Sequence, residues 1–332
     1  MDNNKFLLVK GKAGLGNRIL AVLESILYAK ITHRQLVVDW SDYAYSNDNE
    51  NVFHKFFIAQ GIRDTSIIPS ESSIYPQVWR KNLNKSVNEV IDLYDGGEKD
   101  RHRNPKIWQK YTIDIADTNY NEDILVRWAY FHQLSKLRRH FKNDFKYLAP
   151  LNDADILKKT FYYNLEIHPN IIQRVDEFKK KHFHRQQIIG VHVRYTDLKN
   201  PYDKYYRIIN EFLQKNPDII IFIATDNQHI EKEFKTKYTN VIATNKWYPK
   251  DESSLHQNRN CPDRFENGVQ ALVDICLLSE CDYLIYDTTS TFAFIAKLLS
   301  NIPEENIIDI SKYSLKQQIK NFLKWMRQRQ LI

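Results

Sequence analysis

The sequence lacks the features that would place it in a membrane, in an oxidising compartment or around a structural zinc ion. It has no run of about 18 apolar residues, so no segment is expected to span a bilayer. Residues 1–5 are polar and lead into no apolar run with a small-residue cleavage site, so no secretory signal is predicted. Three cysteines without a CxxC pair favour reduced thiols: Cys261, Cys276 and Cys281. We therefore predict a cytoplasmic protein.

Positive charge is in excess but is not concentrated. The 48 Lys and Arg residues outnumber the 41 Asp and Glu residues, and the net charge of +7 allows an anionic ligand. The basic residues are dispersed, apart from short clusters at residues 138–139 and 179–181 and in the C-terminal tail. A nucleic-acid partner is not expected, because such binders collect their cations on one face. A small phosphate-bearing molecule needs only one or two of them.

Apolar runs alternate with helical periodicity along the chain, which predicts an α/β protein. The 332 residues exceed one ordinary core and suit two domains. Strands are expected at residues 6–10, 36–40, 124–127, 188–193, 219–224 and 283–286. Helices are expected at residues 17–30, 205–215, 269–280 and 292–299, with a long polar loop at 245–267. We predict an N-terminal domain over residues 1–170, a second α/β domain over 171–310 and a basic amphipathic helix over 311–332.

Four polar runs follow predicted strands, at residues 11–18, 194–197, 225–227 and 287–291. Ligands of open α/β sheets bind beyond the carboxyl ends of the strands, where these runs are expected to meet. This convergence predicts an active site between two domains.

The first polar run, Gly-Lys-Ala-Gly-Leu-Gly-Asn-Arg at residues 11–18, has the glycine spacing of a phosphate-binding loop but not its chemistry. A P-loop needs Lys and then Ser or Thr after its last glycine, where this chain has Asn17 and Arg18. The third glycine of the dinucleotide fingerprint is also missing. What remains is a tight turn with exposed N–H groups at a helix N-terminus, suited to an anion or a sugar hydroxyl. Gly14, Gly16, Asn17 and Arg18 are therefore candidate ligand contacts, and a purely structural turn is the alternative.

The sharpest motif is His-Val-Arg-Tyr-Thr-Asp at residues 192–197, which ends a predicted buried strand. The strand delivers His192, Arg194 and Thr196, with Asp197 one step later. A guanidinium can donate a fork of hydrogen bonds to a diphosphate and stays charged when desolvated. Arg194 is therefore the candidate diphosphate ligand, and a strand-end salt bridge between Arg194 and Asp197 is the alternative.

The two remaining runs are weaker signals. Asp226 could bind a ribose, but an Asp-Asn pair at residues 226–227 is also common in turns. Asp-Thr-Thr-Ser-Thr at residues 287–291 places four hydroxyls at a helix N-terminus, which suits a phosphate. One of these hydroxyls would suffice as a helix cap.

Asp153-Ala154-Asp155 matches the DxD signature of metal-dependent glycosyltransferases. That signature should end a buried strand, whereas Pro150 precedes this one and a helical pattern follows it. We interpret it as a helix start with acidic first-turn residues. No other carboxylate or histidine cluster has convincing metal-ligand spacing, so neither a metal nor a cofactor is predicted.

In combination, separated segments resemble the α-1,6-fucosyltransferase family, including its nodulation-type bacterial members. Residues 192–197 resemble the family's His-Val-Arg-Arg-Thr-Asp, and residues 223–227 resemble its Ala-Thr-Asp-Asp. Residues 272–285 and their sequel 288–291 are similar to the third motif. Residues 14–18 and 36–40 look like the opening of nodulation-type members. The order and spacing cover most of the chain, except its middle.

The resemblance implies a GT-B-like fold, with two Rossmann-like domains facing each other across a cleft and the nucleotide in the second. It implies transfer of fucose from GDP-fucose to a glycan or glycoconjugate acceptor, with inversion and without a metal. By position, Arg194 would hold the donor diphosphate, and the loop at 245–267 would fold over the base. Further substrate contacts would come from His192, Asp197, Asp226, Asp274, Ser290 and Thr291.

Two positions depart from the family pattern. The second arginine of the family is Tyr195 here, which removes one cation from the phosphate region. The α-1,6 relatives place a carboxylate base five residues after the motif aspartate, where this chain has Tyr202 with Asp203 next. Asp203 is therefore the candidate catalytic base.

Three alternative functions stay open at the level of sequence. The enzyme could use another nucleotide sugar such as GDP-mannose, the chain could be a non-catalytic nucleotide- or sugar-binding homologue, or, against the dispersed charge, it could bind nucleic acid. The acceptor could be a chitin-like oligosaccharide, a surface glycan intermediate or a protein side chain. The basic C-terminal helix is expected to pack on the body, and weak contact with an acidic membrane surface is the alternative.

Overall fold

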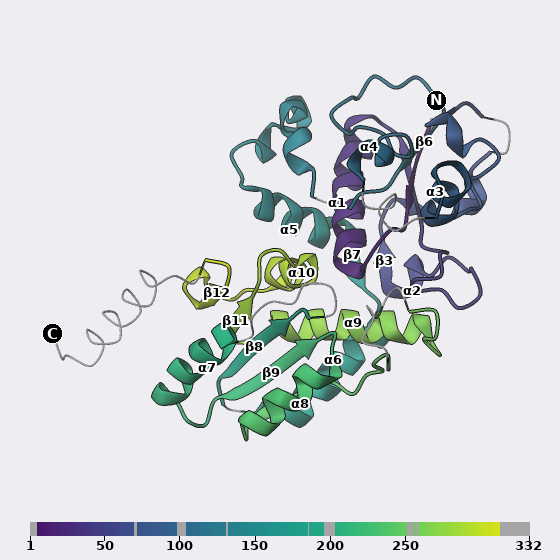
Figure 1. Cartoon of the computed structure of the whole chain (residues 1–332). Helices are drawn as coiled ribbons and strands as arrows, with labels where there is room; N and C mark the ends of the chain where they lie inside the picture. Colours follow the sequence, from purple (N-terminus) through teal and green to yellow (C-terminus); the bar gives the residue numbers. More distant parts are fainter. Residues whose placement is uncertain are drawn as a thin grey trace. The chain divides into compact units, whose positions relative to one another are not determined.

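The computed structural model describes residues 5–69, 72–97, 104–130, 132–184, 186–195, 203–250, 255 and 258–312. These residues form two compact units (Figure 1). The first unit holds the described residues up to Val175 and those from Leu255 to Val273, and the second unit holds the rest. The predicted C-terminal helix at 311–332 lies almost wholly outside the described residues.

Five parallel strands form the sheet of the first unit, in the order β4-β2-β1-β6-β5. They are β1 (Phe6–Lys10), β2 (Gln35–Asp39), β4 (Ile62–Arg63), β5 (Ile74–Tyr75) and β6 (Ile124–Arg127). Every residue of β1 and β6 is buried, as expected of central strands covered on both faces. The chain order reverses at β1, so the glycine loop that follows β1 lies where open sheets bind ligands.

The helix α1 (Leu15–Ile31) packs against β1 and β2. Its apolar residues recur three and four positions apart and are buried, which is the pattern that predicts this helix: Ile19, Leu20, Val22, Leu23, Ile26 and Leu27. The helix α5 (Asp153–Asn164) packs on α1. Asn152 caps α5, and Asp153 and Asp155 occupy its first turn, as the interpretation of the DxD sequence predicts.

The middle of the chain, which the sequence left largely unassigned, adds short elements to the first unit. These are α2 (Phe53–Phe56), α3 (Val87–Asp95), α4 (Pro105–Trp108) and the antiparallel pair of β3 (Phe57–Ala59) with β7 (Leu165–Ile167). A capping box of Ser86 and Glu89 starts α3, and Gly96, with φ of 85°, follows its end. The buried face of α3 joins a core that contains Trp79 and Trp128.

The second unit repeats the parallel arrangement, in the order β10-β9-β8-β11-β12. Its strands are β8 (Ile188–Val193), β9 (Ile220–Thr225), β10 (Val241–Ile242), β11 (Tyr283–Tyr286) and β12 (Ile307–Asp309). Figure 1 shows helices beside this sheet: α6 (Pro169–His182), α7 (Asp203–Lys215), α8 (Gln228–Lys237), α9 (Arg264–Ser279) and α10 (Thr291–Leu299). Of α6 and α9, only the parts from Asp176 and from Asp274 belong to the second unit. The order reverses at β8, the strand that carries His192, so Arg194 follows the switch point of this sheet.

The helix α9 starts at Arg264, five residues before the start that periodicity predicts. Its first turn is polar, and side chains cap it: Asp263 Oδ1 accepts from Glu266 N at 2.9 Å, and Asn47 Oδ1 accepts from Arg264 N at 2.8 Å. Phe265 in this turn packs edge-on against Phe56. Capping and a tertiary aromatic contact therefore extend a helix that apolar spacing alone does not reveal.

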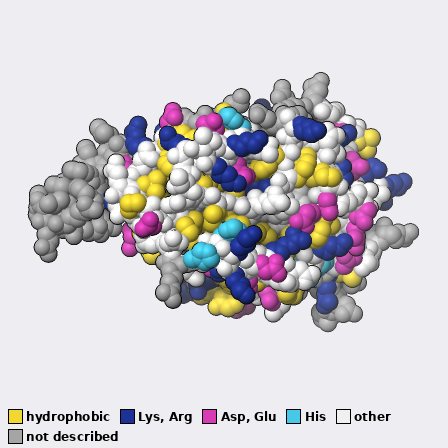
Figure 2. Space-filling model, turned by 90° about the horizontal axis from the view of Figure 1, so that it is seen from below, with side chains coloured by type: hydrophobic (Ala, Val, Ile, Leu, Met, Phe, Trp, Pro, Cys, Tyr) yellow, Lys and Arg dark blue, Asp and Glu magenta, His cyan; other side chains and the backbone are white. Residues whose placement is uncertain are grey.

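None of the helices within the described ranges combines the length and the apolar character needed to cross a bilayer. On the face shown in Figure 2, Lys and Arg side chains lie interspersed with Asp and Glu side chains. Basic and acidic groups are thus mixed on this face, which agrees with the dispersal seen in the sequence.

Candidate functional site

The motif at the end of β8 is held against the end of β9. Parallel register places Val193 opposite Thr225, so the following residues of the two strands also meet. Tyr195 N donates to Asp226 Oδ1 at 2.8 Å. Arg194, the intervening residue, is partly buried at this edge. The backbone pairing thus brings Arg194 and Asp226 together beyond the sheet, as the sequence predicts for residues that follow neighbouring strands.

His192 is enclosed by the second unit. Its ring stacks on Phe292 with centroids 5.0 Å apart, and its carbonyl oxygen accepts from the hydroxyl of Tyr205 at 3.0 Å. Burial, with smaller contributions from Arg194 and Lys246, lowers the pKa of His192 to about 3, so the imidazole is neutral at physiological pH. Its Nδ1 is buried and has no hydrogen-bond partner among the described residues. A neutral imidazole with an unused nitrogen can donate to or accept from a ligand.

Asp274, on α9, is engaged by two neighbours in the second unit. Lys246 Nζ lies 2.5 Å from Asp274 Oδ2, and Thr244 Oγ1 donates to Asp274 Oδ1 at 2.6 Å. The ion pair is almost fully buried, with 5% and 3% of the two side chains exposed. Sequence reasoning missed Lys246, which stands in a polar loop without a motif. Lys246 brings a second cation close to His192, in a region where Tyr195 replaces the arginine of the family.

The start of α10 uses one of its four hydroxyls as a cap. Ser290 is fully buried, and its Oγ accepts from Ala293 N at 3.5 Å. Asp287 Oδ1 accepts from the backbone N–H and the hydroxyl of Thr289, at 2.8 and 2.6 Å. Thr291 is the first helical residue and is partly exposed. Ser290 therefore has a structural role as the cap of α10, and the predicted ligand contacts of Ser290 and Thr291 stay predictions.

Asp203 and Asp197 are the remaining predicted site residues of the second half of the chain. Asp203 is the first residue of α7 and is exposed. Asp197, together with Thr196 and Tyr202, lies outside the described residues. The predicted roles of Asp203 and Asp197 therefore stay predictions.

In the first unit, the glycine loop after β1 leads directly into α1. Gly14 precedes the helix as its N-cap residue, and Gly16 and Asn17 lie in its first turn. The side chain of Arg18 is buried, where Nε donates to Ala13 O at 2.9 Å and Nη2 pairs with Asp42 Oδ2 at 2.6 Å. The loop therefore does not leave Arg18 as a free surface cation but ties it to the segment that follows β2.

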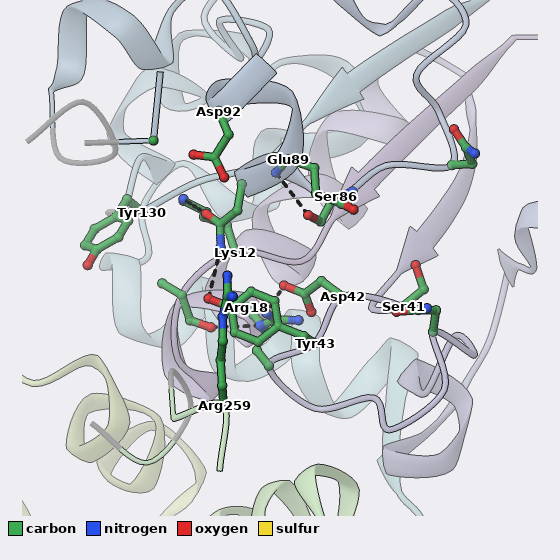
Figure 3. A pocket seen from close by; sticks show the side chains of 16 residues that line it. Lys12, Arg18, Ser41, Asp42, Tyr43, Ser86, Glu89, Asp92, Tyr130 and Arg259 are labelled. Atoms are coloured by element: carbon green, nitrogen blue, oxygen red, sulfur yellow. Dashed lines mark hydrogen bonds and ion pairs between the residues drawn. The ribbon is translucent and has the colours of Figure 1, made fainter. Parts of the chain in front are cut away.

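Beside this loop the first unit contains a cavity of about 570 Å³ (Figure 3). Its lining is largely polar, and six of the lining side chains are ionisable acids or bases of opposite sign: Lys12, Arg18, Arg259, Asp42, Glu89 and Asp92. Sequence reasoning identified only Arg18 of these six. Lys12 lies in the same glycine motif as Arg18 but was not singled out, and the other four come from segments that share no motif with it.

Among the described residues no three His, Cys, Asp or Glu side chains are grouped as metal ligands would be. Asp153 of the DxD sequence pairs with Arg138 and with His132, Nε2 of which lies 3.2 Å from Asp153 Oδ2. Its carboxylate therefore has structural partners within the first unit.

Two parallel five-stranded sheets, each with polar side chains beyond the strand where the order reverses, define a GT-B-type glycosyltransferase architecture of two Rossmann-like domains. The family model described as Nodulation protein Z (NodZ) matches residues 150–318. The chain belongs to this family of fucosyltransferases. The sequence-predicted fold class and enzyme class are thereby confirmed.

The similarity to relatives extends over most of the chain. Nodulation protein Z of Azorhizobium caulinodans is 28% identical over 316 residues, which cover 86% of this chain and 87% of the relative. The solved structure of NodZ α-1,6-fucosyltransferase soaked with GDP-fucose matches with a TM-score of 0.58 and 20% identity, over 89% of this chain and 92% of that one. The apo form of POFUT1 matches with a TM-score of 0.53 and 11% identity, over 93% and 98% of the two chains.

Proposed function

We propose that the chain transfers fucose from GDP-fucose to a glycan or glycoconjugate acceptor, with inversion at the anomeric carbon and without a metal ion. The observation that carries this proposal is the joining of the β8 and β9 ends by Tyr195 and Asp226, which sets Arg194 at the switch point of the second sheet. The solved NodZ relative that was soaked with GDP-fucose supports the choice of donor. We assign the donor to the second unit and the acceptor to the first.

Arg194 acts on the diphosphate. As the bond between the anomeric carbon and the phosphate oxygen breaks, negative charge develops on the departing GDP, and a fixed cation stabilises it. Lys246 adds positive charge in the same region, since both Arg194 and Lys246 contribute to the lowered pKa of His192. Asp274 holds Lys246 in place, so its contribution to donor binding runs through that ammonium group.

The remaining donor contacts are neutral or carboxylate groups. His192 offers a hydrogen bond rather than a charge, because its pKa is about 3. Asp226 lines a cavity of about 180 Å³ together with Tyr248, and we assign its carboxylate to the nucleoside there. The start of α10, with Ser290 and Thr291, supplies N–H and hydroxyl groups to the phosphates. Asp203 and Asp197 are kept as the proposed base and a further substrate contact.

Replacing Arg194 by Ala tests the donor assignment. We expect fucose transfer to fall about 10²- to 10³-fold, because one preorganised charge-stabilising donor is removed. The matched control is Arg207→Ala, which removes an exposed arginine from α7 in the same unit and should leave transfer unchanged. Transfer is measured with radiolabelled GDP-fucose and thermal unfolding checks the fold. Near-normal transfer by folded Arg194→Ala would refute the assignment.

The choice of nucleotide that the chain binds distinguishes the proposed function from its alternatives. Calorimetric titration with GDP, UDP and ADP should give binding by GDP, and tight binding by only UDP or ADP contradicts the proposal. GDP-mannose turned over in preference to GDP-fucose contradicts the choice of sugar. Transfer should persist in EDTA, and a dependence on added divalent metal would count against the metal-free mechanism. A chain that binds GDP-fucose but neither transfers nor hydrolyses it is a binding homologue.

A further inference from the structure

The segment that carries Lys246 is anchored in the second unit by its side chains. The described residues 243–249 follow β10 and belong to neither a helix nor a strand. Thr244 and Lys246 both bind the carboxylate of Asp274 on α9. Loops are more mobile than helices and strands, so the position of this segment depends on such side-chain contacts.

A third anchor joins the same segment to α8. The hydroxyl of Tyr248 donates to Glu231 Oε2 at 2.6 Å, and the other oxygen, Oε1, accepts from Lys235 at 2.6 Å. Only 15% of the Glu231 side chain is exposed, so the hydrogen bond from Tyr248 reaches a largely desolvated carboxylate and is charge-assisted. Burial and this hydrogen bond raise the pKa of Tyr248, so its hydroxyl keeps the proton that it donates.

The ring that Glu231 holds is in turn a contact of the Lys246 ammonium. Lys246 Nζ lies over the ring of Tyr248, 5.6 Å from its centroid, at a distance where a cation and an aromatic face attract each other. The ammonium is thus held by the carboxylate of Asp274 and by an aromatic face. With 5% of its side chain exposed, Lys246 has little room for another rotamer. A Tyr248 ring that turned away would remove one of these two contacts.

Tyr248 also stands at the edge of the sheet where we place the donor. Together with Asp226 it lines the cavity of about 180 Å³ beyond β9. Asp226 accepts from the backbone N–H of Tyr195, the residue after Arg194. The ring that Glu231 fixes therefore belongs to the same region as the two cations that we assign to the donor diphosphate.

We propose that Glu231 and Tyr248 are positioning residues for the donor: their hydrogen bond fixes the segment at residues 243–249 and so keeps the Lys246 ammonium directed at the donor diphosphate. The inference rests on the proposed function, which supplies the diphosphate. Glu231 acts through Tyr248 and Lys246 rather than by touching the nucleotide. A cation that is already in place binds more tightly than one that must be ordered during binding, because ordering costs entropy.

Three substitutions in the full chain separate the hydrogen bond from its surroundings. Tyr248→Phe keeps the ring and removes the donor, and Glu231→Leu removes the acceptor. Glu231→Gln keeps an acceptor oxygen at the same reach and is the conservative variant that should rescue binding. The control Lys235→Met breaks only the pair at Glu231 Oε1. Urea unfolding checks that each variant is folded.

Calorimetric titration with GDP measures the effect on the donor site. We expect Tyr248→Phe and Glu231→Leu each to weaken GDP binding about 10-fold, the lower end for loss of a hydrogen bond to a charged group. Glu231→Gln should stay within about threefold of the wild type, because a neutral acceptor replaces a charged one. Lys235→Met should bind GDP as the wild type does.

A double-mutant cycle tests whether Tyr248 acts through Lys246. Lys246→Gln removes the ammonium, while its amide can still donate to Asp274. In that background there is no cation for the ring to direct, so adding Tyr248→Phe should weaken GDP binding by less than about twofold. A purely structural effect of Tyr248→Phe would instead be the same with and without the ammonium.

Three results would overturn the inference. Folded Tyr248→Phe and Glu231→Leu could bind GDP as the wild type does. The losses of Tyr248→Phe and Lys246→Gln could add, which would mean that Tyr248 acts independently of the ammonium. Glu231→Gln could be as weak as Glu231→Leu, which would assign the effect to the charge of Glu231. Absence of GDP binding by the wild type would instead refute the proposed function, so the two failures are distinguishable.

Discussion

Replacing Lys246 by Met should destabilise the second unit by several kcal/mol. The ammonium of Lys246 and the carboxylate of Asp274 lie 2.5 Å apart, and almost none of either side chain is exposed. Met has nearly the length of Lys but no charge, so the carboxylate would stay buried with only the hydroxyl of Thr244 as a partner. Removing one member of a buried ion pair costs about 3–5 kcal/mol, because the remaining charge is uncompensated.

That loss is a large part of the total stability of an ordinary domain, which is about 5–15 kcal/mol. Replacing the whole pair by apolar residues is often neutral, because both desolvation costs disappear together. The double variant Lys246→Met/Asp274→Leu should therefore regain most of the stability lost in the single variant. Its remaining deficit should come from the hydroxyl of Thr244, which loses its acceptor, at about 1–3 kcal/mol.

Urea unfolding of the full chain, followed by circular dichroism, measures these differences. The control is Lys235→Met on α8. It breaks an i,i+4 ion pair with Glu231, in which 46% of the Lys235 side chain is exposed. An exposed pair of this kind contributes about 0.3–0.5 kcal/mol, so the control should lose little. A loss below about 1 kcal/mol for Lys246→Met, or a double variant less stable than the single one, would refute the reasoning about the buried charge.

Two further substitutions test the first unit. Hydrogen bonds that the His132 ring donates to Glu24 and Asp153 raise its pKa. The stabilising contribution of His132 is therefore complete below the ordinary value of 6.5 and is lost as pH rises through the raised pKa. Compared by thermal unfolding, His132→Gln should therefore lose more stability against the wild type at pH 6 than at pH 9, and an equal loss at both would contradict this. Gly11→Ala would place a methyl group against Arg18 Nη1, closer than van der Waals contact allows, and we expect overpacking to cost about 1–3 kcal/mol of stability. Unchanged urea unfolding of Gly11→Ala would show that Arg18 can move freely.

The polar residues at the ends of β8 and β9 were predictable because they stand directly after apolar strands. The strand at residues 188–193 coincides with β8, so the sequence alone placed Arg194 at a strand end. The strand predicted at 219–224 is shifted by one residue, because Ile219 N donates to Asn216 O in the preceding turn. A shift of this size leaves Asp226 at the sheet edge, and the contact with Tyr195 confirms that the two strand ends meet.

The cavity of the first unit was not predictable in the same way. Asp42, Asn88 and Arg259 are far apart along the chain, and no spacing rule connects them. Lys12 donates to the amide oxygen of Asn88, and the Arg259 guanidinium lies over the ring of Tyr43. Such contacts depend on how the segments after β1, after β2 and before α9 pack together, which is tertiary information that a single sequence does not display.

The contacts of Arg18 bear on the two interpretations that the sequence left open for the glycine loop. One interpretation was a ligand contact and the other a structural turn. Arg18 packs where Gly11 has no side chain, and it neutralises one oxygen of Asp42 while the other oxygen keeps its full acceptor capacity. A free Asp42 would carry an uncompensated buried charge. The glycine loop therefore has a structural role, because it holds Arg18 against Asp42, whereas its role as a ligand contact stays a prediction.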